Sequence, residues 1–97
     1  RSMSFRKVAV LGLGKVGHLA AELLVESGFE VTGVDAREVK APFPTRSVDL
    51  QDQAAIADLL KGQEAVLSCL PFHLNIGVST VAHALGLVYV PALDMLA

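Results

Sequence analysis

Three glycines, Gly12, Gly14 and Gly17, follow the apolar residues 8–11 at the spacing G-x-G-x-x-G. In this pattern the first glycine lets the chain turn sharply out of a strand. The second removes a side chain that would keep a pyrophosphate off the backbone, and the third lets a helix pack closely on the sheet. We expect this helix to begin at about Lys15, with its free N–H groups and positive dipole end pointing at the phosphates. The spacing therefore predicts a dinucleotide-phosphate site.

A carboxylate stands where such a site needs a ligand for the ribose. Asp35 ends the predicted strand 30–35, 18 residues after Gly17, and an acidic side chain there accepts hydrogen bonds from the adenosine ribose hydroxyls. Because a carboxylate repels a 2′-phosphate, Asp35 favours NAD over NADP as the cofactor. Arg37 leaves NADP open, since its guanidinium pairs with phosphate or stacks on adenine if Asp35 turns away. Ala36 lies between the two in the same candidate site.

The residues around the glycines predict the elements that would position them. Apolar side chains recur at helical spacing after Lys15, and a Ser-Gly pair at residues 27–28 ends the helix. Residues 30–35 then form a second, largely buried strand, which closes a βαβ unit. The apolar helix residues expected to face the sheet are Val16, Leu19, Ala20, Leu23 and Leu24.

The rest of the chain continues to alternate between strand and helix signals. Pro42 and Pro44 predict an extended connection over residues 36–46. Alternating elements with short connections predict an α/β fold with a doubly wound parallel sheet, Rossmann-like, with about five strands in the order 3-2-1-4-5. The remaining elements are a third strand at residues 47–50, a helix capped by Asp52 and ended by Gly62, a strand at 64–70, a helix at 74–85 and a strand at 87–90.

The predicted strand order places a ligand crevice between the first and fourth strands, outside their carboxyl ends. Residues 68–72 would face this crevice together with the glycines. Asp49 has two interpretations, a contact to adenine or a polar strand end that caps the next turn. The candidate cofactor-binding residues are Gly12, Gly14, Lys15, Val16, Gly17, Asp35, Ala36, Arg37, Asp49, Leu70 and Pro71.

The sequence offers few candidates for catalysis or metal binding. His73 lies just past Pro71 at the crevice, but no carboxylate is in sequence register with it, so a local role at the helix start is favoured. His18 and His83 fall within helices and are expected to be surface or packing residues. The single cysteine, Cys69, lies in an apolar run and is expected to be a buried structural thiol. We therefore assign no catalytic residue and no metal site.

Composition and charge exclude several functional classes. The net charge is −2 and Lys and Arg do not cluster, which argues against nucleic-acid binding. No apolar run approaches the roughly 20 residues of a membrane span and no signal peptide is recognisable, so we expect a soluble cytoplasmic protein. Residues 1–6 are interpreted as a vector remnant and leader, and residues 7–97 as one dinucleotide-binding domain, a fragment of a longer enzyme.

Five segments carry a resemblance to a known family: residues 11–17, 31–37, 48–50, 65–73 and 81–86. They resemble the N-terminal NAD(P)-binding Rossmann domain of the saccharopine dehydrogenase family, over nearly the whole chain from Lys7 to Val90. The most specific element is the strand that ends in Leu-Pro-Phe at residues 70–72. The resemblance implies an NAD(P)-dependent oxidoreductase acting on an amino acid or a secondary amine formed from one. In this family much of the substrate pocket comes from a second domain.

Two other functions stay open. A dinucleotide-sensing regulatory module uses the same strand, glycines and acid without catalysis, but carries a Gly-Asp signature at the third strand, where this chain has Val48-Asp49-Leu50. A domain with this fold and no ligand is the other alternative, because fold alone does not prove function. The high hydrophobic content (53%) and an open sheet edge predict a homo-oligomer or a missing second domain.

Overall fold

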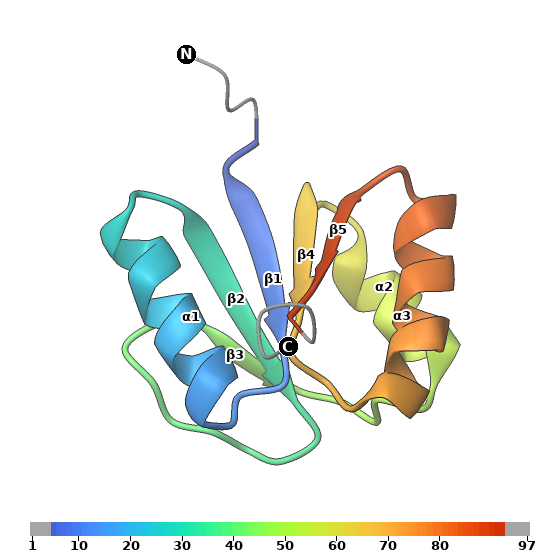
Figure 1. Ribbon diagram of the computed structural model, residues 1–97, viewed down its shortest axis with the longest axis horizontal. Helices are drawn as coiled ribbons and strands as arrows, with labels where there is room; N and C mark the ends of the chain where they lie inside the picture. The colour runs from blue at the N-terminus through green and yellow to red at the C-terminus, as the bar shows by residue number, and fades with distance from the viewer. Residues whose placement is uncertain (1–4, 93–97) are drawn as a thin grey trace.

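The chain folds around a five-stranded parallel sheet with the strand order β3-β2-β1-β4-β5 (Figure 1). The structure is a computed structural model, and it describes residues 5–92. The strands are β1 (Lys7–Leu11), β2 (Glu30–Asp35), β3 (Thr45–Ser47), β4 (Ala65–Ser68) and β5 (Val88–Pro91). The predicted fold class and strand order are confirmed.

Helices cover the two faces of this sheet unequally. Helix α1 (Lys15–Glu26) lies on one face, while α2 (Gln53–Leu60) and α3 (Phe72–Ala84) lie together on the other (Figure 1). The central strand β1 is buried on both faces, because Val8 and Val10 pack on the α1 side and Ala9 and Leu11 on the α2–α3 side. This explains why β1 is continuously apolar from Val8 to Leu11 instead of alternating with polar residues.

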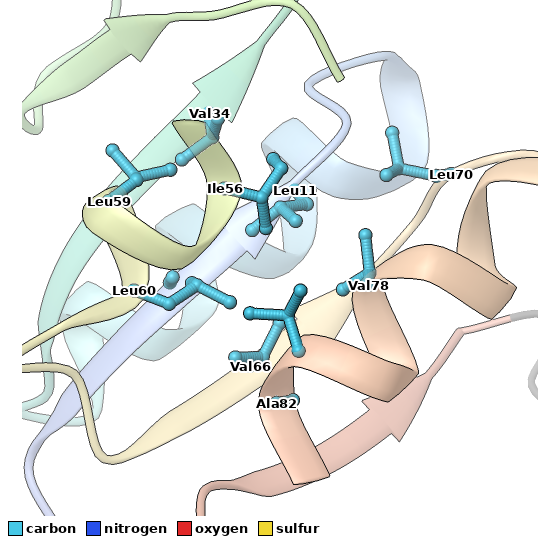
Figure 2. Close-up of a cluster of buried hydrophobic side chains, with 11 residues drawn as sticks. Leu11, Val34, Ile56, Leu59, Leu60, Val66, Leu70, Val78 and Ala82 are labelled. Atoms are coloured by element: carbon cyan, nitrogen blue, oxygen red, sulfur yellow. The ribbon is translucent and has the colours of Figure 1, made fainter. Parts of the chain in front are cut away.

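Helix α2 forms as its sequence predicts. The side chain of Asp52 accepts a hydrogen bond from the backbone N–H of Ala55 (3.1 Å), which confirms it as the N-cap. Ile56, Leu59 and Leu60 form the buried face of the helix. Figure 2 shows these side chains gathered with those of α3 over the sheet, so the core on this face lies between two helices and the central strands.

The third strand is where the predicted boundaries fail most. It was expected at residues 47–50, but β3 is Thr45–Ser47. Pairing starts directly after Pro44, whose carbonyl accepts the N–H of Gly33 (2.8 Å), because the missing N–H of a proline does not prevent its carbonyl from joining the ladder. The chain then turns at Asp49, whose carbonyl accepts the N–H of Asp52. The strand therefore ends before the residues expected to form most of it.

Other element ends differ from expectation by one or two residues. Helix α3 begins at Phe72 instead of residue 74, because Pro71 itself serves as the N-cap. Strand β4 is confined to Ala65–Ser68, shorter than the predicted 64–70. Strand β5 begins at Val88 instead of residue 87, because the N–H of Leu87 bonds the carbonyl of Ala82 and closes the end of α3.

The predicted apolar face of α1 is buried only in part: Leu24 packs against the core, but three of the other residues do not. Leu19 and Leu23 are 57% and 54% exposed and Val16 is also exposed, whereas Gly17 and Ala21 are buried. Small residues face the sheet because they let the helix backbone approach the strands closely. The larger apolar residues are displaced to the outer flank of the helix, where they remain open.

Two residues of the segment interpreted as leader contact the domain. The ring of Phe5 stacks on Phe29 with centroids 5.7 Å apart. The carbonyl of Arg6 accepts the N–H of Glu30 (2.8 Å). Residues 1–4 of that segment lie outside the described residues.

Candidate functional site

The glycine loop, residues 12–17, starts with a turn that only glycine fits. Gly12 has a φ of +90°, and a Cβ there would lie 2.9 Å from the carbonyl oxygen of Cys69. The Gly12 N–H donates to the carbonyl of Val34 (2.7 Å), which ties the turn to β2. The first glycine therefore carries the chain from β1 between two neighbouring strands.

Gly17 and Gly14 serve different purposes. A Cβ on Gly17 would overlap the carbonyl oxygen of Gly12, so this glycine allows α1 to start against the loop. A Cβ on Gly14 would meet no protein atom within 4 Å. The protein therefore needs Gly17 for packing, while Gly14 leaves space that its own fold does not use.

The N-terminus of α1 opens into that space. The helix begins at Lys15, as predicted, with Gly14 as an N-cap that supplies no side-chain hydrogen bond. Unpaired N–H groups of a first turn bind anions, and the helix dipole favours negative charge there. Lys15 is exposed and adds a positive charge at the same place. These features fit a pyrophosphate.

A hollow of about 250 Å³ lies beside the loop. It brings together residues from α1 and from the end of β4, as the predicted crevice required; its lining is Gly14, Lys15, Val16, Gly17, Cys69, Leu70 and Ala92. A larger hollow of about 550 Å³ lies at the opposite, amino-terminal end of the strands, beside Lys7 and Glu30. We place the site at the smaller one, because ligands of parallel α/β sheets bind at the carboxyl ends of the strands.

Asp35 lies at the end of β2 with its carboxylate directed at the loop. Its Oδ2 accepts the N–H of Leu13 (2.7 Å), and its Oδ1 accepts the N–H of Arg37 (3.0 Å). The Arg37 Nε lies 3.4 Å from the same Oδ1. The Asp35 side chain is 12% exposed, so part of it can be reached by solvent.

These contacts determine the ionisation of Asp35. Burial raises the pKa of this carboxyl, but the hydrogen bonds from Leu13 and Arg37 and the charge of Arg37 together lower the pKa below its ordinary value of 3.8. Asp35 is therefore a carboxylate at neutral pH.

The lowered pKa makes the stability of the domain depend on pH. As pH falls toward 3.8, the unfolded chain takes up a proton at Asp35 before the folded chain does, so the free energy of unfolding falls as pH falls until both states are protonated. The stability difference between wild type and Asp35→Asn should therefore shrink between about pH 5 and about pH 2. Urea unfolding across this range measures it, with the exposed Asp58→Asn as control. A difference independent of pH would contradict the prediction.

Four of the other candidate residues do not line this hollow. Ala36 and Arg37 are exposed beyond β2, and Pro71 is exposed at the start of α3. Asp49 is exposed, and its Oδ1 accepts the N–H of Gln51 (2.9 Å). Of its two interpretations, this contact agrees with a polar strand end that caps the next turn. Leu70, in contrast, is buried and lines the hollow.

Sequence reasoning missed two features of the site. The hydrogen bond from Leu13 to Asp35 joins residues 22 positions apart, and no local pattern marks it. Cys69 is half-buried on the wall of the hollow instead of fully buried. Burial raises the pKa of the Cys69 thiol, so it is protonated at neutral pH and suited to packing.

The histidines do not enter this site. His73 is exposed and borders a separate hollow between α2 and α3. The ring of His18 packs on Phe43 with centroids 5.5 Å apart, and His83 is exposed near the end of α3. The structure shows neither a metal site nor a membrane-spanning helix among residues 5–92. No group of three or more His, Cys, Asp or Glu side chains in this range is placed to hold a metal ion. Within the same residues no helix is long and apolar enough to cross a membrane.

Comparison with known proteins agrees with this geometry. The sequence profile described as "Saccharopine dehydrogenase NADP binding domain" matches residues 8–92, from β1 to the end of β5. The chain belongs to this family. The match includes the glycine loop, Asp35 and the strand that leads into Leu70 and Pro71. An NAD(P)-binding domain is therefore the role that the family assigns to these residues.

Solved structures share the fold at low sequence identity. Saccharopine dehydrogenase (L-Glu forming) from Saccharomyces cerevisiae matches with a TM-score of 0.81 and 21% identity, over 90% of this chain and 21% of that one. A short-chain dehydrogenase/reductase superfamily protein from Agrobacterium tumefaciens, solved with bound NAD, matches with a TM-score of 0.77 and 24% identity, over 87% and 31%. WbmH from Bordetella bronchiseptica, in complex with NAD+, matches with a TM-score of 0.73 and 21% identity, over 87% of this chain and 37% of that one.

This chain thus spans less than half the length of these three solved chains. No curated protein matches its sequence.

Proposed function

We propose that this chain is the NAD-binding domain of a saccharopine dehydrogenase-like oxidoreductase that acts on an amino acid or on a secondary amine derived from one. The observation that carries the choice of NAD is the Asp35 carboxylate, which is ionised and lies at the end of β2 beside the glycine loop. The substrate class is inferred from the family match over residues 8–92.

In this proposal the chain binds and orients the cofactor. The open position at Gly14 admits the pyrophosphate, and the first-turn N–H groups of α1 donate to its oxygens. The free edge of the Asp35 carboxylate accepts hydrogen bonds from the adenosine ribose. When bound, the nicotinamide supplies hydride transfer, and the protein contributes orientation and electrostatics.

A calorimetric titration with NADH and, separately, NADPH tests the proposal. We expect NADH to bind at least about tenfold more tightly, equivalent to about 1.4 kcal/mol, because the Asp35 carboxylate repels the 2′-phosphate of NADPH. A preference for NADPH would move the selectivity to Arg37. Absence of binding to either would remove the dinucleotide function from this chain.

An open apolar surface supports a further part of the proposal, that other protein covers this domain in the assembled enzyme. It consists of Val16, Leu19 and Leu23 on the outer flank of α1, with Val88 and Val90 of β5, which are 48% and 44% exposed. The two valines pair in register with Ala65 and Leu67, which pack on the α1 side of the sheet. On the face that carries α1, no helix of the described residues covers β4 and β5 (Figure 1). Parallel sheets are normally covered on both sides.

If this surface is an interface, the isolated chain should self-associate through it. Size-exclusion chromatography with light scattering should give a mass above that of the monomer at high concentration, because exposed apolar area drives association. The double variant Leu19→Lys with Val88→Lys should return the chain to a monomer, whereas Lys at the exposed Glu26 of the same helix should not. A wild-type chain that stays monomeric would contradict the prediction.

A further inference from the structure

We propose that Asp35 is a positioning residue for the glycine loop as well as a ligand for the cofactor ribose, so that one carboxylate controls both the shape of the loop and the choice between NAD and NADP. The ribose and selectivity part rests on the proposed function. The loop part stands on contacts within the protein.

The end of β2 holds two successive N–H groups of the loop. The carbonyl of Val34 accepts the Gly12 N–H at 2.7 Å, and the Oδ2 of Asp35 accepts the Leu13 N–H at 2.7 Å. Both groups come immediately before Gly14, the position left open for the pyrophosphate. The direction in which the backbone enters this position therefore depends on β2, through one backbone acceptor and one side-chain acceptor.

Leu13 is also fixed through its side chain. The side chain is buried and lies over Gly33 of β2, where a Cβ would come within 2.9 Å of the Leu13 Cδ1. An N–H in this position is out of reach of solvent, so loss of its acceptor leaves it without a partner. The loop must then shift to find water or another acceptor. Asp35 is consequently needed for the loop even when no cofactor is bound.

The two oxygens of the carboxylate have separate partners. Oδ2 serves the loop, and Oδ1 accepts from the backbone N–H of Arg37 and lies 3.4 Å from its guanidinium. The Arg37 side chain is 69% exposed, so it can swing away when the carboxylate is removed. A carboxylate oxygen accepts more than one hydrogen bond, so Asp35 can receive the ribose while it holds Leu13.

Substitutions at this position therefore separate charge from positioning. Asp35→Asn keeps an oxygen for the Leu13 N–H but removes the negative charge and releases Arg37. Asp35→Ala removes the charge and the acceptor together. Asp35→Glu keeps the charge but, being one methylene longer, displaces the oxygens from Leu13. If charge alone mattered, the Asn and Ala variants would behave alike.

The experiment measures two quantities for each variant. Amide hydrogen exchange of Leu13 by NMR in the ligand-free chain reports the loop contact, and calorimetric titration with NADH and NADPH reports selectivity. We expect Asp35→Asn to keep Leu13 protected while the ratio of NADPH to NADH affinity rises at least tenfold. Asp35→Ala should speed Leu13 exchange at least tenfold and weaken both cofactors. Asp35→Glu should also speed Leu13 exchange but retain the preference for NADH. If the Ala variant does not fold, this variant alone tests whether Asp35 holds the loop. Asp58→Ala, an exposed acid on α2, is the control.

Each result has a clear consequence. Unchanged Leu13 exchange in both Asp35→Ala and Asp35→Glu would overturn the positioning role. An Ala variant that binds NADPH as tightly as the Asn variant would show that charge alone governs selectivity. If the wild-type chain binds neither dinucleotide, the proposed function fails, and with it the ribose part, while the exchange of Leu13 still decides whether Asp35 holds the loop.

Discussion

The Gly14→Val variant is expected to lose NADH affinity by about 100-fold or more, equivalent to about 2.8 kcal/mol, while it remains folded. A side chain at this position meets no protein atom within 4 Å, and its φ of −72° is open to any residue. In the proposed complex the valine side chain would occupy the place of the pyrophosphate and shield the first-turn N–H groups of α1.

Loss of binding in Gly14→Val must be separated from loss of folding, so stability and NADH binding are measured on the same variant. Valine is a poorer N-cap than glycine, which costs about 0.5–1 kcal/mol and lowers Tm by about 2–8 °C. Circular dichroism and thermal unfolding check that point, and calorimetry measures NADH binding. Glu26→Val, at the far end of the same helix, adds the same exposed side chain and should bind NADH normally. Unchanged affinity in Gly14→Val would mean that the pyrophosphate does not lie at the glycine loop.

Local chemistry explains why much of the fold was predictable. The Asp52 cap and the three buried apolar residues of α2 lie within one short segment, so sequence pattern alone locates that helix. Strand β2 was predicted with its observed bounds, because Gly28 and the apolar run that follows mark both ends. The strand order follows from the alternation of strands and helices together with the handedness of their connections.

The errors arise where tertiary contacts override the local pattern. Apolar spacing in α1 predicts that Leu19 and Leu23 face the sheet, but the close approach at Gly17 rotates the small residues inward and leaves the leucines open. Strand β3 ends early because Asp49 is used in the turn into α2. Neither effect is visible in a window of neighbouring residues.

The candidate site shows the same division. The glycines and Asp35 could be placed from the sequence, since strand, turn and helix follow one another directly. The contact between Asp35 and Leu13 could not, because it forms only when β1 and β2 pair in register. The half-buried position of Cys69 likewise depends on the end of β4 meeting the start of α1.

The second large effect is expected from Gly17→Ala, which should destabilise the domain by about 2 kcal/mol net and lower its Tm by about 8–16 °C. The added Cβ would overlap the carbonyl oxygen of Gly12. That carbonyl cannot move freely, because the Gly12 N–H is bonded to the carbonyl of Val34 and there is no room for even a Cβ between Gly12 and the carbonyl of Cys69. Alanine gains about 1 kcal/mol over glycine in a helix. The clash is larger than this gain, so the net effect is destabilising.

Gly77→Ala in α3 is the matched control, because it also replaces a helical glycine by alanine. Its Cβ would meet only the Nε2 end of Gln53, at 2.8 Å, and that flexible side chain can move aside. Helix propensity should then dominate, so Gly77→Ala should keep or raise stability by up to about 1 kcal/mol. Urea unfolding followed by circular dichroism compares the two variants. Equal stabilities would mean that Gly17 is not needed where α1 starts against the glycine loop, whereas a large difference would assign Gly17 to this packing.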